Sequence, residues 1–216
     1  MTKTSKLSIG LYFLACAVEI CFCFCCPENR LWSKPILMPL LFVVALSLNQ
    51  FKTQNISLLL VSIIFAWLGD IILLSDYKLS FLLGLSAFLS MHLIYIYLFN
   101  KQRSIGLHKH KLSVLIISAI STFSIVFFWN KTASLQIPVS IYCIVIGLMS
   151  LLALMRWKSQ YYWHVVAGSF LFMISDFLLA FNKFVNEFSS ADILVMSTYL
   201  IGQFLIIYGY IKDLKN

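Results

Sequence analysis

The sequence predicts an all-α membrane protein, a polytopic transmembrane helical bundle of about eight spans. Three observations predict it: 61% of the 216 residues are hydrophobic, only 11% are charged, and the apolar residues come in long runs. The mean hydropathy of +0.93 exceeds what the core of a water-soluble protein accommodates. A bilayer admits helices or closed barrels, and the alternating pattern of barrel strands is absent, so helices remain.

The apolar runs are separated by short polar connections, and each is taken as one span. In chain order they cover residues 7–26, 35–49, 57–75, 79–99, 112–129, 135–155, 161–181 and 190–211. These spans leave no room for a soluble domain. Residues 1–216 are therefore expected to form a single transmembrane domain.

The first two spans need separate justification. The first follows Lys3 and Lys6 as the apolar core of a signal peptide would, but no small-residue cleavage site is visible and the run continues to Cys26. It is therefore expected to stay in the protein. The second run is the shortest, and Pro35, directly after Lys34, suits the first position of its helix.

The cationic residues predict the orientation of the bundle. They occur singly or in small groups and form no contiguous basic stripe, so no nucleic-acid partner is expected. With both termini inside (N-in/C-in), eleven cations lie inside and five outside, as the positive-inside rule requires. The eleven are Lys3, Lys6, Lys52, Lys101, Arg103, Lys109, Lys111, Arg156, Lys158, Lys212 and Lys215, and the five are Arg30, Lys34, Lys78, Lys131 and Lys183. In a bacterium the inner, plasma membrane would be the location.

The six cysteines predict no metal site and no cofactor. Five of them lie in the first span, where helical geometry spreads them around the axis, so they cannot converge on one ion. Apolar packing or lipidation is the expected role of these thiols.

The chain also contains an internal similarity. Gly69-Asp70 in the third span resembles Ser175-Asp176 in the seventh, and His92 in the fourth corresponds to Gln203 in the eighth. Two four-span halves, about 7–99 and 112–211, would then form a parallel repeat whose axis lies along the membrane normal.

Ionisable side chains within the spans indicate where chemistry could occur, because a charge there costs at least ~2.5 kcal/mol. Asp70 and Asp176 are the main pair, since equivalent positions in two repeats would bring both carboxylates to one central cavity. Two such carboxylates titrate apart, as general acid/base catalysis needs. An ion or proton site in a transporter and a hydrogen-bonded pair joining helices are the alternatives.

Other polar residues of the spans are candidates for binding a substrate. Glu19 completes an acidic cluster, pairs with Lys34 or makes an interhelical hydrogen bond. Lys34 otherwise snorkels to the interface or binds a phosphate. The remaining candidates are His92 and Gln203, for which a helix-to-helix hydrogen bond is the alternative role, and Tyr95 and Tyr142, which are compatible with such a cavity.

Short motifs in a fixed order complete the sequence evidence. They are Lys34-Pro35 with Met38-Pro39, Gly69-Asp70 with Leu73-Leu74, Gly84 with Phe88 and His92 through Tyr95, Tyr142 with Met149, Ser175-Asp176 with Leu179-Ala180, and Gln203. In these motifs, spread over about residues 34 to 207, the chain resembles the YhhN-like membrane proteins, whose characterised animal members are lysoplasmalogenases.

The resemblance implies hydrolysis of the vinyl ether bond of a lysoplasmalogen, a lysophospholipid, to a fatty aldehyde and a glycerophospho-ethanolamine or glycerophosphocholine. It also implies that Asp70 and Asp176 are catalytic. One would deliver a proton while the other stabilises the cation and activates water, as in paired-carboxylate glycosidases. An ion-coupled transporter and a non-enzymatic lipid-binding protein, with membrane lipids as partners, are the competing hypotheses. The sequence does not specify the oligomeric state.

Overall fold

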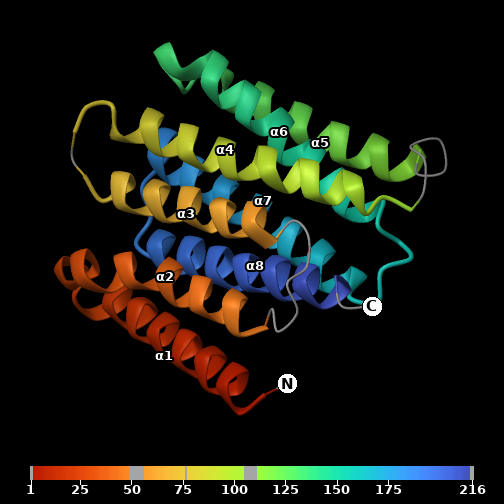
Figure 1. Cartoon of the computed structure of the whole chain (residues 1–216). Helices are drawn as coiled ribbons and strands as arrows, with labels where there is room; N and C mark the ends of the chain where they lie inside the picture. The colour runs from red at the N-terminus through yellow and green to blue at the C-terminus, as the bar shows by residue number, and fades with distance from the viewer. Residues whose placement is uncertain (1, 49–55, 76, 105–110, 215–216) are drawn as a thin grey trace.

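The computed structural model describes residues 2–48, 56–75, 77–104 and 111–214. Eight helices in these ranges are long and apolar enough to cross a membrane, which confirms the predicted all-α polytopic bundle. They are α1 (Lys3–Cys25), α2 (Arg30–Leu48), α3 (Ile56–Leu73), α4 (Ser80–Lys101), α5 (Lys111–Trp129), α6 (Gln136–Leu154), α7 (Tyr162–Phe184) and α8 (Ala191–Asp213) (Figure 1). Of the cations used to predict orientation, Lys52, Lys109 and Lys215 lie outside the described residues, and the orientation stays a prediction.

Helix α2 begins earlier than its sequence predicts. It starts at Arg30, directly after the short 3-10 helix η1 (Pro27–Asn29), so Pro35 lies inside the helix and does not open it. Pro39 has no N–H to donate to the carbonyl of Pro35. The indole N–H of Trp67 in α3 takes that place at 2.8 Å. A neighbouring helix therefore satisfies the backbone group that the second proline frees, as a membrane interior requires.

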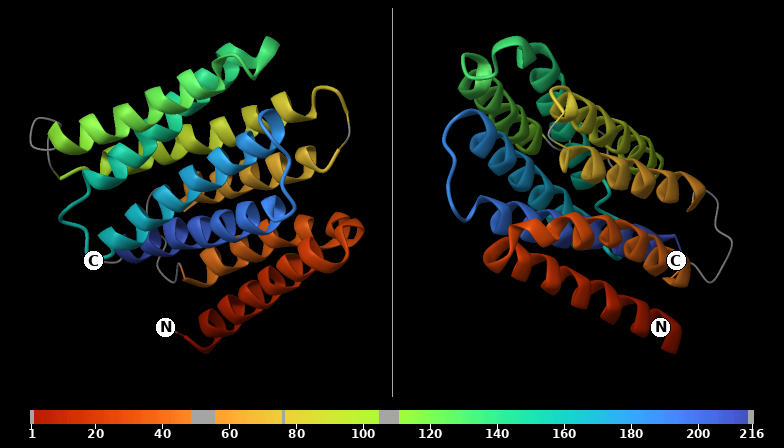
Figure 2. Two further views of the ribbon diagram at one scale, coloured as in Figure 1. Left: turned by 180° about the vertical axis from the view of Figure 1, so that it is seen from behind. Right: turned by 90° about the vertical axis from the view of Figure 1, so that its left-hand side faces the viewer.

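Consecutive helices pack as antiparallel pairs, α1 with α2, α3 with α4, α5 with α6, and α7 with α8. The pairs join through contacts of α2 with α3, α4 with α6 and α6 with α7, while α8 returns to pack against α1 and α2 (Figures 1 and 2). Both termini lie at one end of the bundle, here named the terminus end. The connecting residues 26–29, 74–75, 77–79, 130–135 and 185–190 lie at the opposite end, named the far end.

Glycines permit a close approach of the α7 and α8 backbones. A Cβ atom on Gly168 would lie 2.7 Å from the carbonyl oxygen of Gly202, and one on Gly202 would lie 2.9 Å from the carbonyl oxygen of Gly168. Small residues at facing positions are a common way for membrane helices to pack without a hydrophobic driving force. This contact fixes α7, which carries Asp176, against α8.

The terminus end is fastened by Arg156, which lies in the connection between α6 and α7 and is fully buried. Its guanidinium donates to Gln102 at the end of α4 and, over 2.8 Å, to Asp213 at the end of α8. The rings of Phe99 and Tyr210 lie 5.2 and 5.5 Å from its central carbon. Burial lowers the pKa of Arg156, and the charge of Asp213 opposes that shift. Three elements are thereby joined by one side chain.

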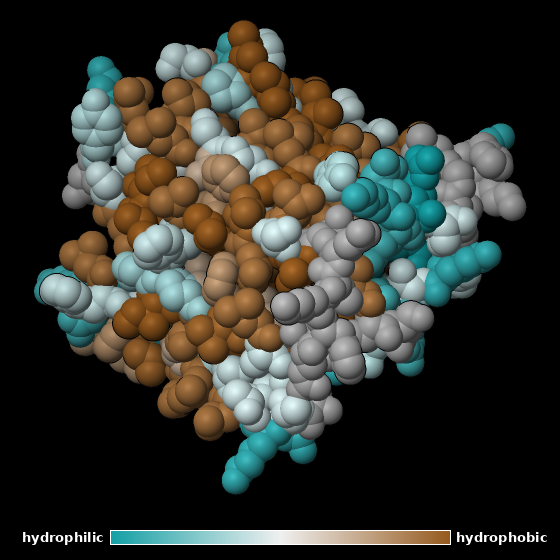
Figure 3. Space-filling view, in the orientation of Figure 1, coloured by the Kyte–Doolittle hydropathy of each residue, from teal (hydrophilic) through white to brown (hydrophobic). Residues whose placement is uncertain are grey.

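The outside of the bundle is apolar. Large hydrophobic side chains such as Leu14, Trp32, Val126 and Trp163 are 63%, 78%, 70% and 67% exposed. On the face drawn in Figure 3, hydrophobic atoms cover the middle and hydrophilic atoms gather toward the end at the right. Hydrocarbon, not water, suits such a surface. The protein is therefore an integral, multi-pass membrane protein, whereas its division into two repeat halves stays a prediction.

Candidate active site

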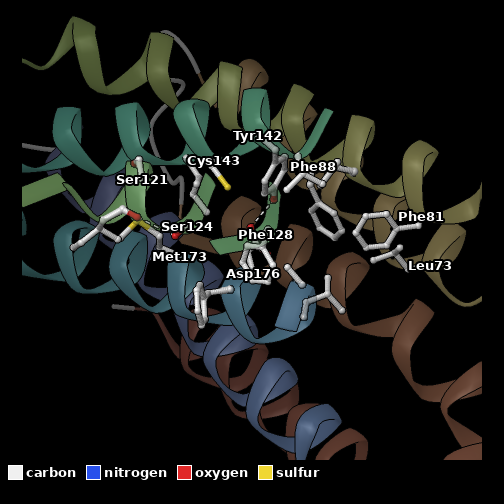
Figure 4. Close-up of a pocket in the computed structure, with 17 residues that line it drawn as sticks. Leu73, Phe81, Phe88, Ser121, Ser124, Phe128, Tyr142, Cys143, Met173 and Asp176 are labelled. Atoms are coloured by element: carbon white, nitrogen blue, oxygen red, sulfur yellow. Dashed lines mark hydrogen bonds between the residues drawn. The ribbon is translucent and has the colours of Figure 1, made fainter. Parts of the chain in front are cut away.

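A cavity inside the bundle contains the carboxylate of Asp176. It lies among α4, α5, α6 and α7, and most of its lining is aliphatic or aromatic (Figure 4). The polar side chains that reach it are Ser121, Ser124, Tyr142, Cys143 and Asp176. We name it the Asp176 cavity.

Three polar residues from three helices meet beside this cavity. The hydroxyl of Tyr142 on α6 donates to Oδ2 of Asp176 on α7 over 2.5 Å. Nε2 of His92 on α4 lies 3.0 Å from the Tyr142 hydroxyl and 3.7 Å from the same carboxylate oxygen. Since the Tyr142 proton goes to Asp176, the hydroxyl oxygen is free to accept from His92. The carboxylate side chain is 16% exposed and His92 fully buried, so Asp176 is the accessible member.

Asp70 belongs to a second cluster. Its Oδ2 accepts a hydrogen bond from the Tyr199 hydroxyl on α8 at 2.8 Å, and its Oδ1 lies 3.7 Å from Nζ of Lys34 on α2. Lys34 is buried, so the expectation that it snorkels to the interface is wrong, whereas phosphate binding by Lys34 stays a prediction. With α2 starting at Arg30, Lys34 falls within the helix and faces α3, where Asp70 supplies the opposite charge that a buried ammonium needs.

Glu19 also has a different partner from the one expected. Its Oε1 lies 3.1 Å from Nε of Arg30, and its Oε2 accepts from the Ser33 hydroxyl. Arg30 also forms a salt bridge with Asp192 on α8, in which Nη1 of Arg30 lies 2.6 Å from Oδ2 of Asp192. The pairing of Glu19 with Lys34 is therefore wrong. Arg30 and Asp192 were missed because both lie at the ends of apolar runs, where charges ordinarily meet headgroups.

An aromatic wall separates the two aspartates. It consists of Phe88, Phe172 and Tyr199, whose ring centroids lie 5.3 Å (Phe172 to Tyr199), 5.9 Å (Phe88 to Tyr199) and 6.3 Å (Phe88 to Phe172) apart. Tyr199 bonds Asp70 on one side, and Phe88 lines the Asp176 cavity on the other. Asp70 does not line that cavity. The expectation that both carboxylates face one cavity is therefore not met.

The packing of α3 on α4 fixes the position of the aromatic wall. A Cβ atom on Gly69 would lie 2.8 Å from the ring of Phe88, so only a glycine beside Asp70 leaves room for that ring. Phe172 in turn packs edge-on against His92, with centroids 4.7 Å apart. The sequence signal for this wall was available, since Phe88 and the Gly69-Asp70 pair both belong to the motifs of the resemblance.

The last two candidates join helices outside the cavity. The hydroxyl of Tyr95 on α4 donates to Oε1 of Gln203 on α8 at 2.7 Å, and Nε2 of Gln203 lies 2.9 Å from Sδ of Met91. Both Tyr95 and Gln203 are fully buried, and neither lines the Asp176 cavity. The contacts of Gln203 match the helix-to-helix alternative. In the described part of the chain, no group of three or more His, Cys, Asp or Glu side chains is placed to hold a metal ion.

The chain is similar to known proteins. The model of the YhhN family matches residues 29–210. The chain is 28% identical over 186 residues to lysoplasmalogenase TMEM86A of Bos taurus, covering 83% of this chain and 76% of that protein. It is 27% identical over 209 residues to lysoplasmalogenase TMEM86B of Homo sapiens, covering 94% and 85%. No solved structure matches.

Proposed function

This chain belongs to the YhhN family, and from that premise we propose that it hydrolyses the vinyl ether bond of lysoplasmalogens. The products would be a fatty aldehyde and a glycerophospho-ethanolamine or glycerophosphocholine. Relatives that cover most of its length are named lysoplasmalogenases. The observation that carries the proposal is the partly exposed carboxylate of Asp176 in an otherwise largely apolar cavity.

The cavity suits a single-chain lipid. Its aromatic and aliphatic lining supplies contacts for hydrocarbon, and its few polar groups can orient a polar bond, which is the usual composition of a lipid or small-molecule site. A vinyl ether is weakly polar and lies where the chain meets the glycerol. Such a bond would lie beside Asp176, with the adjoining part of the chain against the apolar lining of the cavity.

The first chemical step is protonation of carbon. The carboxyl of Asp176 transfers its proton to the β-carbon of the vinyl ether, and the electrons of the carbon–carbon double bond form the new C–H bond. The α-carbon and the ether oxygen then share a positive charge as an oxocarbenium ion. The carboxylate left on Asp176 stabilises that cation, as carboxylates do in glycosidases.

The second step consumes one water. Its oxygen bonds to the α-carbon while Asp176 takes one of its protons, which gives a neutral hemiacetal and restores the carboxyl. The hemiacetal then collapses: the C–O bond to glycerol breaks, the hydroxyl proton passes to the departing oxygen, and aldehyde and alcohol remain. One carboxyl group thus serves first as acid and then as base.

Tyr142 and His92 orient this carboxyl group. The Tyr142 hydroxyl donates a hydrogen bond to Oδ2 of Asp176, whereas no described residue donates one to Oδ1. We therefore assign proton delivery to Oδ1. His92 holds the Tyr142 hydroxyl from its other side. A side chain fixed in this way needs little reorganisation before reaction.

Asp70 receives a positioning role in this proposal. It anchors the hydroxyl of Tyr199, whose ring packs edge-on against Phe88 and Phe172. Those rings lie between Asp70 and His92, so Asp70 supports the wall behind the reacting groups. Paired-aspartate catalysis, which the resemblance implies, is the alternative, and the variants of Lys34 and Asp70 described in the Discussion decide between them.

The test is aldehyde release from a lysoplasmalogen by the detergent-purified protein, with an acyl lysophospholipid as competing substrate. Asp176→Asn removes the acid without changing the shape of the side chain, and we expect turnover to fall by about 10²- to 10⁴-fold at an unchanged melting temperature. Glu187→Gln, a change at an exposed carboxylate outside the cavity, is the matched control. A folded Asp176→Asn variant with full turnover would exclude the mechanism.

A further inference from the structure

The Asp176 cavity reaches the side of the bundle as well as its interior. Ile120 on α5 lines the cavity, yet 37% of it is exposed. Met173 on α7, which also lines the cavity, is partly exposed. Of the eight helices α5 is the least buried, and it packs mainly on α6. The boundary between α5 and α7, here named the seam, is therefore a wall of the cavity that faces the outside of the bundle.

Phenylalanine rings close one part of this seam. Phe127 and Phe128 of α5 meet Phe177 and Phe181 of α7, with centroids 6.1 Å (Phe127 to Phe177), 6.2 Å (Phe127 to Phe181) and 5.3 Å (Phe128 to Phe177) apart. We name these four the phenylalanine cluster. Phe127 lies about two helical turns, about 10 Å, closer to the far end than Ile120. Phenylalanine rings thus close the seam near the far end, whereas Ile120 and Met173 flank it toward the bundle centre.

The cavity is too short to hold a whole fatty chain. Its lining spans Val139 to Ile146 on α6 and Met173 to Ala180 on α7, each about 10 Å along the helix axis. Only about 5 Å of this length separates Asp176 from Met173. A chain of about sixteen carbons extends to roughly 20 Å, at about 1.2 Å per bond. With its first carbons beside Asp176, most of the chain has no room inside.

We propose that the hydrocarbon chain of the substrate leaves the cavity sideways, between α5 and α7 at the level of Ile120 and Met173, and that its remainder lies in the bilayer. The inference rests on the proposed function. This path costs little free energy, because lipid tails in contact with the emerging chain are as apolar as the protein surface would be. Selectivity then depends on the vinyl ether and headgroup, and the length of the chain has little effect on turnover.

A binding experiment tests the path of the chain independently of turnover. The probe is a saturated 1-O-alkyl lysophospholipid, which has no vinyl ether to hydrolyse, with a photoreactive diazirine in the middle of its chain. We expect adducts that excess unlabelled lysolipid suppresses, at Ile120, Met173 or their lipid-facing neighbours Phe123 and Ile174, which are 60% and 48% exposed. Suppressible adducts confined to buried residues, or found on α1, would overturn the proposal.

A turnover experiment tests its consequence. A lysoplasmalogen with a rigid multi-ring group at the end of its chain should be cleaved within about threefold of the untagged lipid, because that group stays in the bilayer. Ile120→Trp, which fills the seam, should lower kcat/KM for both substrates by about tenfold. Val126→Trp on the same helix, at a position 70% exposed, is the control and should change neither. Rejection of the tagged lipid by a protein that cleaves the untagged one would show that the chain ends inside.

The two experiments separate the two proposals. Seam adducts without aldehyde release from any lysoplasmalogen would leave the chain path standing and reject the reaction. Aldehyde release with suppressible adducts elsewhere would support the reaction and reject the chain path.

Discussion

The hydroxyl of Tyr142 donates to the carboxylate of Asp176 across 2.5 Å, and the two residues come from helices that meet only in the folded bundle. The same hydroxyl lies 3.0 Å from Nε2 of His92. One phenol therefore links the candidate acid to a buried imidazole. Its removal is the most direct probe of how the carboxyl group is held.

Tyr142→Phe keeps the ring and removes the hydroxyl. We expect kcat to fall by about 10- to 100-fold while KM changes by less than about threefold, because the carboxyl group loses its orientation and the lipid keeps its apolar contacts. Steady-state aldehyde release measures both constants. Tyr12→Phe deletes another buried phenol, which donates to the carbonyl of Leu200 at 2.9 Å, and serves as the control. Equal losses in the two variants would mean that Tyr142 acts only through stability.

Asp70→Asn leaves the ammonium of Lys34 buried without its counter-charge. Removing one partner of a buried pair costs about 3–5 kcal/mol, so this variant should melt at a clearly lower temperature than the wild type. Lys34→Met combined with Asp70→Asn removes both charges at nearly the same volume and should regain most of that stability. Thermal unfolding in detergent, followed by the fluorescence of the native tryptophans, measures the difference.

The same double variant decides the role of Asp70 in the reaction. An asparagine can still accept the hydrogen bond of Tyr199, so a positioning role predicts turnover within about tenfold of the wild type once stability is restored. Paired-aspartate catalysis predicts a stable protein with no turnover. Aldehyde release at a temperature where both proteins are folded distinguishes these outcomes.

Gly168→Ala should disturb the contact of α7 with α8. The added methyl group would meet the carbonyl oxygen of Gly202 at 2.7 Å, closer than packed atoms approach, so the helices must separate. We expect destabilisation of about 1–3 kcal/mol, typical of overpacking. Gly10→Ala is the control, since nothing lies within 4 Å of its added methyl group. If both variants melt alike, the close approach contributes little.

Arg156→Ala should loosen the terminus end without altering the chemistry. Asp213, whose side chain is 5% exposed, would keep the N–H of Tyr161 at 2.8 Å but lose the guanidinium. We expect a loss of about 3 kcal/mol or more in stability. Because Arg156 lies outside the Asp176 cavity, turnover per folded molecule should stay within about twofold of the wild type. A large change in KM would contradict this separation between the contacts of Arg156 and the candidate active site.

The sequence alone determined the number, order and approximate limits of the helices. Whether a run of residues spans a bilayer depends on its length and on the transfer free energies of its own side chains, both of which are local quantities. The start of α2 was the clear error. Pro35 looks like an N-terminal residue when read by itself, but an indole on α3 supports the helix past Pro39.

Only the tertiary structure decided which polar side chains meet. The pairing of Asp70 with Lys34 and Tyr199, of Glu19 with Arg30, and of Asp176 with Tyr142 depends on how each helix is rotated about its axis. In a bilayer both faces of a helix are apolar, so the pattern of hydrophobic residues carries little information about that rotation. It is set instead by close packing at positions such as Gly69 and Gly168, and by the need of each buried charge for a partner.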